Sequence, residues 1–188
     1  MSLEQFKEPI RVADEIVDKK LTAYRMDSQD NDMRSVAGLG ACSCCDYFLP
    51  RNESIVLIEE TRLLETVKML RAEFSYLKNE QKIDAIVNEK IKNEHQLKAY
   101  GAMLVLSRLA VDCANVKKLV HGKKRKKLQF WLVASRIDTP GKQIYFDSQR
   151  DKLKERLTDS IGGTLKVKVE VLSAKDLKTK LSHNATAP

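Results

Sequence analysis

The stretch "SIVLIEET", residues 54–61, constrains the fold of this chain more than any other. Its apolar run at 55–58 is short and rich in β-branched residues, which favours a buried strand. The run ends in Glu59 and Glu60, and burying a carboxylate costs roughly several kcal/mol unless a cation compensates. The sequence therefore predicts a core strand whose acidic end is exposed, paired with an arginine or occupied by a metal ion.

Hydrophobic periodicity predicts the elements on either side of this strand. Residues 9–24 have the apolar spacing of a helix, with Pro9 suited to its first turn. A short strand is expected over 43–49, followed by a turn at 50–53. The later part of the chain is expected to form helices over 63–91 and 94–120, a strand over 128–136, a helix over 148–163, a strand over 165–173 and a helix over 174–182.

This order of elements predicts an α/β fold. Two adjacent strands followed by strands that helices separate are typical of a mixed β-sheet flanked by helices. The length of 188 residues fits a single domain, 1–188, with an enlarged helical insertion at about 63–94 and a disordered tail at about 183–188. The polar N-terminus and the lack of a run of about 20 apolar residues predict a cytoplasmic chain with no membrane partner.

Charge is distributed unevenly along the chain. Residues 1–100 contain 15 Lys and Arg against 18 Asp and Glu, whereas residues 101–188 contain 19 against 8. The densest basic run ends in Lys123, Lys124, Arg125, Lys126 and Lys127. Such a run attracts polyanions through counterion release, and nucleic acid is the expected partner, although a solvated loop would have the same composition.

Two acidic residues are expected to meet at one end of the predicted hairpin. Strand alternation places Ile55, Leu57 and Glu59 on one face, and twelve residues separate Glu59 from Asp46, enough for two short strands and a turn. Two converging carboxylates suit Mg²⁺ or Mn²⁺, which prefer oxygen ligands. Such an ion would offset the repulsion between the carboxylates and activate a water for attack on a phosphate.

These residues resemble the PD-(D/E)xK nuclease superfamily. The pattern Asp46-x12-Glu59-x-Thr61 looks like a variant of its motif, and "QLKAY", Gln96 to Tyr100, is similar to the Q-x3-Y motif of RecB-like members. The resemblance implies a restriction-endonuclease-like fold, with Gln96 and Tyr100 aimed together at a bound strand because they are four residues apart on a helix.

The same resemblance implies roles for further residues. Glu15, on the expected first helix, would support the metal held by Asp46 and Glu59. The family's lysine position is occupied by Thr61, which differs from the motif. An alternative register would make Glu60 the ligand with Arg62 as the cation, and Lys98 or Lys68 on a helix could replace the missing lysine.

Two functions follow as hypotheses. The first is a metal-dependent nuclease that hydrolyses DNA, favoured over RNA, in a defence, restriction or repair system. The alternative is a catalytically degenerate module that binds nucleic acid, or a protein partner or second copy through the helices at 63–115. The intact acid pair favours the first, and the missing lysine favours the second. The chain has no GxxxxGK[ST], GxGxxG after a strand or GxSxG motif that would indicate other chemistry.

Overall fold

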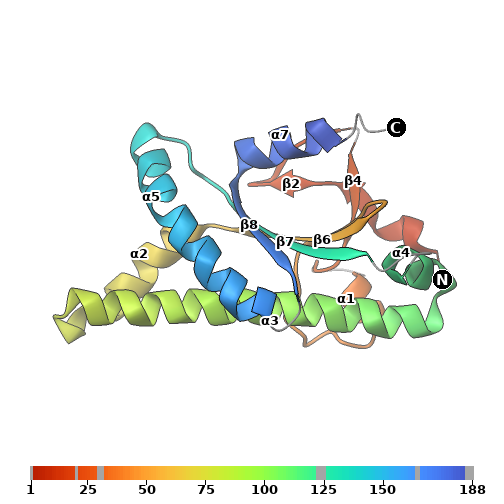
Figure 1. Cartoon of the computed structure of the whole chain (residues 1–188), viewed down its shortest axis with the longest axis horizontal. Coiled ribbons are helices and arrows are strands. Elements are labelled where there is room, and N and C mark those ends of the chain that lie inside the picture. The colour runs from red at the N-terminus through yellow and green to blue at the C-terminus, as the bar shows by residue number, and fades with distance from the viewer. Residues whose placement is uncertain (1, 20, 29–31, 122–125, 164–165, 185–188) are drawn as a thin grey trace.

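A six-stranded mixed β-sheet forms the centre of the molecule (Figure 1). The computed structural model describes residues 2–19, 21–28, 32–121, 126–163 and 166–184. The strand order is β1-β4-β5-β6-β7-β8, antiparallel from β1 to β6 and parallel from β6 to β8. These strands are β1 (Lys7–Pro9), β4 (Thr22–Arg25), β5 (Tyr47–Pro50), β6 (Ser54–Thr61), β7 (Lys127–Ala134) and β8 (Lys168–Ser173). The structure therefore confirms the predicted α/β class with a mixed sheet.

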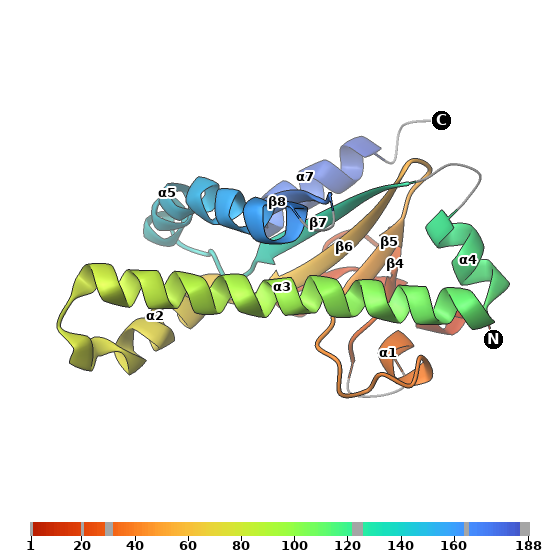
Figure 2. The same ribbon diagram turned by 60° about the horizontal axis from the view of Figure 1, so that its bottom comes forward.

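Helices cover both faces of this sheet (Figures 1 and 2). One face packs against α3 (Glu80–Asp112) and α5 (Pro140–Leu157), and the other packs against α7 (Ala174–Asn184). The described residues also form the turns η1 (Leu3–Phe6), η2 (Ser75–Leu77) and η3 (Thr158–Gly162), and the helices α1 (Met33–Val36), α2 (Leu63–Glu73) and α4 (Ala114–His121). Among the described residues, no helix combines the length and apolarity needed to cross a membrane.

Strand β6 separates two apolar cores because its side chains alternate between the faces. Ile55 and Leu57 belong to the core beneath α3 and α5, whereas Val56 and Ile58 belong to the core beneath α7. Glu59 follows Leu57 by two residues, so it lies on the same face of β6 as Ile55 and Leu57. The same alternation that buries the strand on both sides thus directs a carboxylate toward α3.

The predicted helical region after β6 forms a hairpin of two unequal helices. α2 ends at Glu73, and Asn79 begins α3 by accepting a hydrogen bond from the Lys82 amide at 2.9 Å. α3 then continues for 33 residues, about 50 Å at 1.5 Å per residue. The break expected near residue 92 is therefore wrong, because α3 is continuous through that position and the break between the two helices lies between Glu73 and Glu80.

The helix predicted over 9–24 is also wrong. This region instead forms β1, the hairpin β2 (Arg11–Val12) and β3 (Glu15–Ile16), and β4. Its apolar residues satisfy a helical spacing by chance, but the pairing of β4 with β5 decides the conformation. Pro9 lies in β1, a strand at the edge of the sheet, where proline is tolerated.

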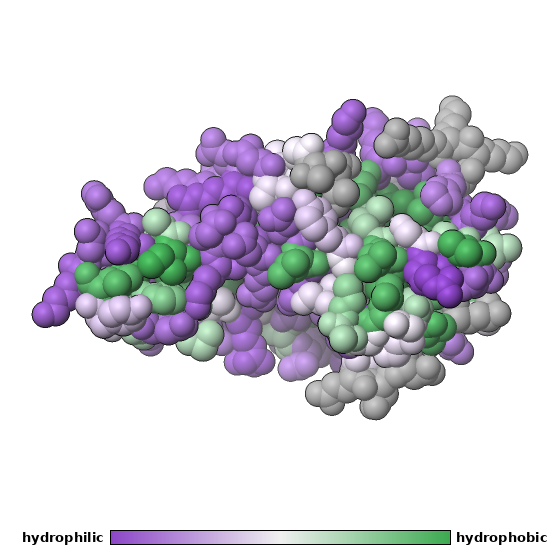
Figure 3. Space-filling view, turned by 90° about the horizontal axis from the view of Figure 1, so that it is seen from below, coloured by the Kyte–Doolittle hydropathy of each residue, from purple (hydrophilic) through white to green (hydrophobic). Residues whose placement is uncertain are grey.

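The exposed side of α3 carries a regular series of apolar residues. Leu97, Leu104 and Val111 are seven residues apart, and each is more than half exposed. Figure 3, which views α3 from outside the molecule, shows apolar residues gathered near both ends of this face with hydrophilic residues between them.

At the C-terminus, α7 extends to Asn184, so residues 183 and 184 of the expected disordered tail are helical, and 185–188 lie outside the described residues.

Candidate active site

Asp46 and Glu59 lie next to each other at one end of the β5–β6 hairpin. The antiparallel register pairs Tyr47 with Ile58, so continuing it by one residue puts Asp46 across from Glu59. Side chains opposite each other in such a pair share a face, with Cβ atoms about 5 Å apart. Asp46 Oδ2 also accepts a hydrogen bond of 2.7 Å from the Glu60 amide, which fixes this carboxylate against the end of β6.

Lys98, on the helix α3 that packs against this face of the sheet, adds a positive charge to the two carboxylates. Its Nζ donates a hydrogen bond to Glu59 Oε1, forming an ion pair between residues 39 apart in sequence. Lys98 Nζ also lies 3.6 Å from Glu94 Oε1, one turn earlier on the same helix. The Glu59 side chain is 1% exposed and that of Lys98 25%, so the ammonium group lies between the buried carboxylate and solvent.

The loop before β5 is held tightly against α3 near Lys98. A Cβ atom on Gly101 would lie 1.7 Å from the Ser43 carbonyl oxygen, a contact that only glycine permits. Cys45 Sγ donates to the Lys98 carbonyl oxygen at 3.5 Å. Both contacts are made by residues just before Asp46, and they position it relative to the helix that supplies Lys98.

Burial makes both carboxylates reluctant to ionise. Burial raises the pKa of Glu59 well above its ordinary value, and the charge of Asp46 raises it further. Burial also raises the pKa of Asp46, although the Glu60 amide and the charges of Arg25 and Lys98 oppose this. Ionisation of the Asp46 and Glu59 carboxylates therefore needs a nearby positive charge, and Lys98 supplies part of it.

Two buried polar atoms near Lys98 have no hydrogen-bond partner among the described residues. They are Glu59 Oε2 and Nδ1 of His95, which precedes Lys98 by three residues on α3. Burial and the charge of Lys98 lower the pKa of His95 to about 3, so its imidazole is neutral at physiological pH. An unpaired buried acceptor is costly, and groups of this kind often belong to functional sites.

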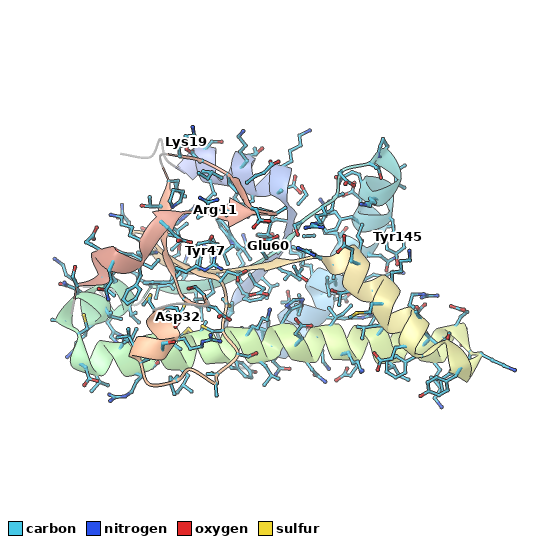
Figure 4. All side chains as sticks on the ribbon, turned by 180° about the vertical axis from the view of Figure 1, so that it is seen from behind. Arg11, Lys19, Asp32, Tyr47, Glu60 and Tyr145 are labelled. Carbon is cyan, nitrogen blue, oxygen red and sulfur yellow. The ribbon has the colours of Figure 1, made fainter. Side chains whose placement is uncertain are left out.

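Glu60 and Thr61 have surroundings that differ from those of Glu59. Glu60 points to the opposite face, where Oε1 accepts a hydrogen bond of 2.9 Å from the Ala13 amide in the β2–β3 turn. Figure 4 shows Glu60 beneath the hairpin that carries Arg11. Thr61 shares the face of Glu59 at the last position of β6, and its carbonyl oxygen accepts a hydrogen bond from the Ser135 amide at 2.9 Å. Arg62, the cation of the alternative register, lies 4.0 Å from Glu65, and its role beside Glu60 stays a prediction.

Glu15 lies in the small β2–β3 hairpin, where it is exposed and paired with Val12. Its expected placement on a helix is wrong because no helix forms over 9–24. The link between this hairpin and the β6 strand end is the hydrogen bond from Ala13 to Glu60.

Gln96 and Tyr100 face the end of α5 rather than open solvent. Gln96 Nε2 donates to Tyr100 Oη at 2.9 Å and to the Ser160 carbonyl oxygen at 3.4 Å, and Tyr100 Oη donates to the same carbonyl at 3.3 Å. The two side chains do lie together on one helical face, as their spacing predicts. Both side chains therefore donate hydrogen bonds to a backbone carbonyl of the π-helical turn η3, that of Ser160.

The basic segment falls partly outside the described residues, which include neither Lys123, Lys124 nor Arg125. Lys126 Nζ donates to the Arg51 carbonyl oxygen at 2.6 Å, and Lys127 is exposed at the start of β7. The predicted role of the segment in binding nucleic acid stays a prediction.

The arrangement offers two oxygen ligands rather than a full cage. Across the residues with described coordinates, no group of three or more His, Cys, Asp or Glu side chains could hold a metal ion. Mg²⁺ nevertheless often binds through one or two carboxylates and keeps several waters. The orphaned Glu59 Oε2 and the adjacent Asp46 carboxylate fit this mode.

Sequence reasoning identified Asp46 and Glu59 from strand alternation and named Lys98 as one of two replacement lysines. It missed Gly101 and His95. Each lies three residues from Lys98 on α3, so helical spacing around that lysine was the available signal. Comparisons with protein-family models, with curated proteins and with solved structures found no match for this chain.

Proposed function

We propose that this chain is a metal-dependent nuclease whose site consists of Asp46, Glu59 and Lys98. The observation that carries the proposal is the ion pair of Lys98 with Glu59, a carboxylate that is buried beside Asp46 and has one oxygen without a partner. The pair supplies from α3 the cation that the PD-(D/E)xK pattern has two residues after its glutamate. A restriction-endonuclease-like relationship belongs to the same proposal.

Asp46 and Glu59 would hold a divalent ion such as Mg²⁺ or Mn²⁺. When bound, the ion supplies a Lewis acid for a phosphate oxygen and lowers the pKa of a bound water. Asp46 and Glu59 are held in fixed positions at the strand end, so they would determine where the ion and the substrate bind. Their raised pKa values mean that an added cation would stabilise their ionised forms.

Lys98 would act on the phosphate. Its ammonium group has three donors, and its described polar contacts are with Glu59 and Glu94. The side chain is partly exposed, so a further donor can reach a phosphate oxygen from solvent. Preorganised cations of this kind stabilise charge that develops in phosphoryl transfer.

The alternative is a module that binds without cutting. The hydrogen bonds that hold Gln96 and Tyr100 to Ser160 favour a structural role for the Q-x3-Y pair. In this alternative, the pair of Lys98 and Glu59 would stabilise the contact between α3 and the sheet.

A cleavage assay tests the proposal. Wild-type protein, Asp46→Asn, Glu59→Gln and Glu60→Gln are incubated with plasmid DNA, single-stranded DNA and RNA in Mg²⁺ or Mn²⁺. Cleavage is expected from the wild type and from Glu60→Gln, a matched control on the opposite face, and it should be lost in the other two. Wild-type protein that cuts none of these substrates and binds neither ion contradicts the proposal. Binding of nucleic acid under those conditions would favour the alternative.

A further inference from the structure

A continuous groove runs between α2, α3 and α5. Two adjoining hollows of about 510 and 580 Å³ share Leu64, Val67, Arg71 and Tyr145, so they form one depression, here called the α2–α5 groove. Their volumes lie in the range of ligand-binding clefts. Figure 4 shows Tyr145 on α5 beside the start of α2, at the end of the molecule where β6 terminates.

The groove has an apolar floor and a cationic rim. Leu63, Val87, Ile91 and Leu153 contribute buried apolar surface to the floor. Its basic residues are Lys68, Arg71, Lys142, Lys152 and Arg156. Arg71 pairs with Glu80 and Asp84, and Lys142 pairs with Asp138. The acidic lining residues Glu65 and Asp84 pair with Arg62 and Arg71. Within the described part of the chain, Lys68, Lys152 and Arg156 make no ion pair, so the rim carries more positive than negative charge.

The groove leads to the candidate active site along two elements. Leu63 follows Thr61 by two residues, directly after the strand that carries Glu59. On α3, Ile91 precedes Lys98 by seven residues, which is two turns or about 10 Å along the same side of the helix. A chain lying in the groove would therefore approach the site where Lys98 meets Glu59.

We infer that the α2–α5 groove binds single-stranded nucleic acid and guides it to the candidate active site, an inference that rests on the proposed nuclease function. An apolar floor with an aromatic ring suits unpaired bases, while cations along the rim suit the phosphates. Tyr145 is 43% exposed and offers a stacking surface. In a duplex the base faces are already stacked on one another, so duplex DNA would leave this floor unused.

A binding measurement tests the inference on the full chain. The probes are fluorescein-labelled oligothymidine of about 12 nucleotides and a duplex of the same length, both in EDTA so that cleavage cannot interfere. The single strand should bind more tightly than the duplex. Charge reversal at two exposed positions, Lys152→Glu with Arg156→Glu, should weaken single-strand binding at least ten-fold. The slope of log affinity against log salt should become shallower by about 1.4, since each phosphate contact of a single strand contributes about 0.7.

Two further variants separate the groove from general charge and from the floor. Lys175→Glu with Lys178→Glu is the matched control, since both lysines are exposed on α7, which packs on the opposite face of the sheet. It should change single-strand affinity less than two-fold. Tyr145→Leu keeps apolar volume but removes the ring, and should weaken binding about five-fold or more. Thermal melting of each variant shows whether the fold is retained.

The outcomes distinguish this inference from the proposed function. Wild-type protein that binds in the groove but cuts nothing overturns the nuclease function alone. Cleavage of single strands that is unaffected by Lys152→Glu with Arg156→Glu overturns the groove assignment alone. Equal affinity for duplex overturns the single-strand preference. Binding of an acidic helical peptide that these two substitutions abolish, with oligothymidine binding unchanged, assigns the groove to a protein partner instead.

Discussion

Lys98 on α3 forms an ion pair with Glu59 on β6, although 39 residues separate them in sequence. The cation therefore reaches the acidic strand end from a helix rather than from the strand itself. In the proposed nuclease, this relationship explains how a chain with threonine at position 61 can still present a lysine to the phosphate.

The first prediction concerns moving the lysine from position 98 to position 61. Lys98→Met should reduce cleavage about 10²- to 10³-fold, the range seen when one charge-stabilising donor is removed from an active site. Adding Thr61→Lys should restore part of the activity because position 61 shares the face of Glu59. Initial rates of cleavage for the single and double variants measure the effect.

A control for this exchange is Thr61→Met in the Lys98→Met background, which changes the side chain without restoring charge. It should give no recovery. Equal recovery by methionine and lysine at position 61 would mean that Lys98 acts through packing.

The pH dependence of stability should reveal the buried carboxylate. Burial and Asp46 raise the pKa of Glu59 in the folded state above its unfolded value, so the folded protein binds this proton more tightly. The resulting stabilisation is complete below the unfolded pKa of about 4.5 and is lost as pH rises through the folded pKa. The free energy of unfolding, measured with urea in EDTA between pH 7 and 9, should therefore decrease with pH. Below pH 7 the lowered pKa of His95 acts in the opposite direction. Glu59→Gln should flatten this decrease.

Glu170 provides a carboxylate of opposite behaviour for comparison. Burial tends to raise its pKa, but hydrogen bonds from Lys168 and Lys154 and the charge of Lys180 lower it to about 2. Its stabilisation is present above pH 4.5 and disappears as pH falls toward 2. Glu170→Gln should thus alter the acidic limb and leave the slope between pH 7 and 9 unchanged. A change in that slope would show that the assignment to Glu59 is wrong.

Metal binding is expected to release protons. Asp46 and Glu59 both have raised pKa values, and a divalent ion binds their ionised forms, so affinity for Mg²⁺ or Mn²⁺ should increase with pH. Calorimetric titration in two buffers of different ionisation enthalpy measures the number of protons released. Glu60→Gln should titrate like the wild type because Glu60 lies on the other face. Binding that is independent of pH would exclude this pair as the ligands.

Gly101→Ala should disrupt the contact that positions Asp46. The added Cβ would overlap the Ser43 carbonyl oxygen, and backbone atoms cannot move aside as a flexible side chain can. We expect a loss of about 1–3 kcal/mol or more in the free energy of unfolding, typical of overpacking in a core. Gly141→Ala is a suitable comparison, since its Cβ would meet open space near the start of α5. Equal stability of the two variants would contradict the close approach.

Local patterns predicted the elements nearest the site well. The apolar run and its acidic end located β6 over Ser54–Thr61, and alternation placed Glu59 on the side of Ile55 and Leu57. These features depend on neighbouring residues within one strand. Sequence reasoning therefore had the information it needed at this point.

The elements that were predicted wrongly depend on contacts between residues that are far apart in sequence. β2, β3 and β4 are two to four residues long, too short for their own periodicity to exceed the helical pattern of residues 9–24. Their structure comes from pairing with other strands. In the same way, nothing local to position 98 shows that Lys98 rather than Lys68 meets Glu59, because the packing of α3 across the sheet decides it.

The supply of Lys98 by α3 also links chemistry to the order of folding. The β5–β6 hairpin brings Asp46 beside Glu59 through local pairing, but without α3 the carboxylates lack their ammonium partner. Docking of α3 both buries Glu59 and delivers the charge that compensates for its burial. A nascent or partly unfolded chain would hold the acidic pair in water without its lysine. In the proposed nuclease, an active site would then indicate that α3 has docked, and a misfolded copy would cut no nucleic acid.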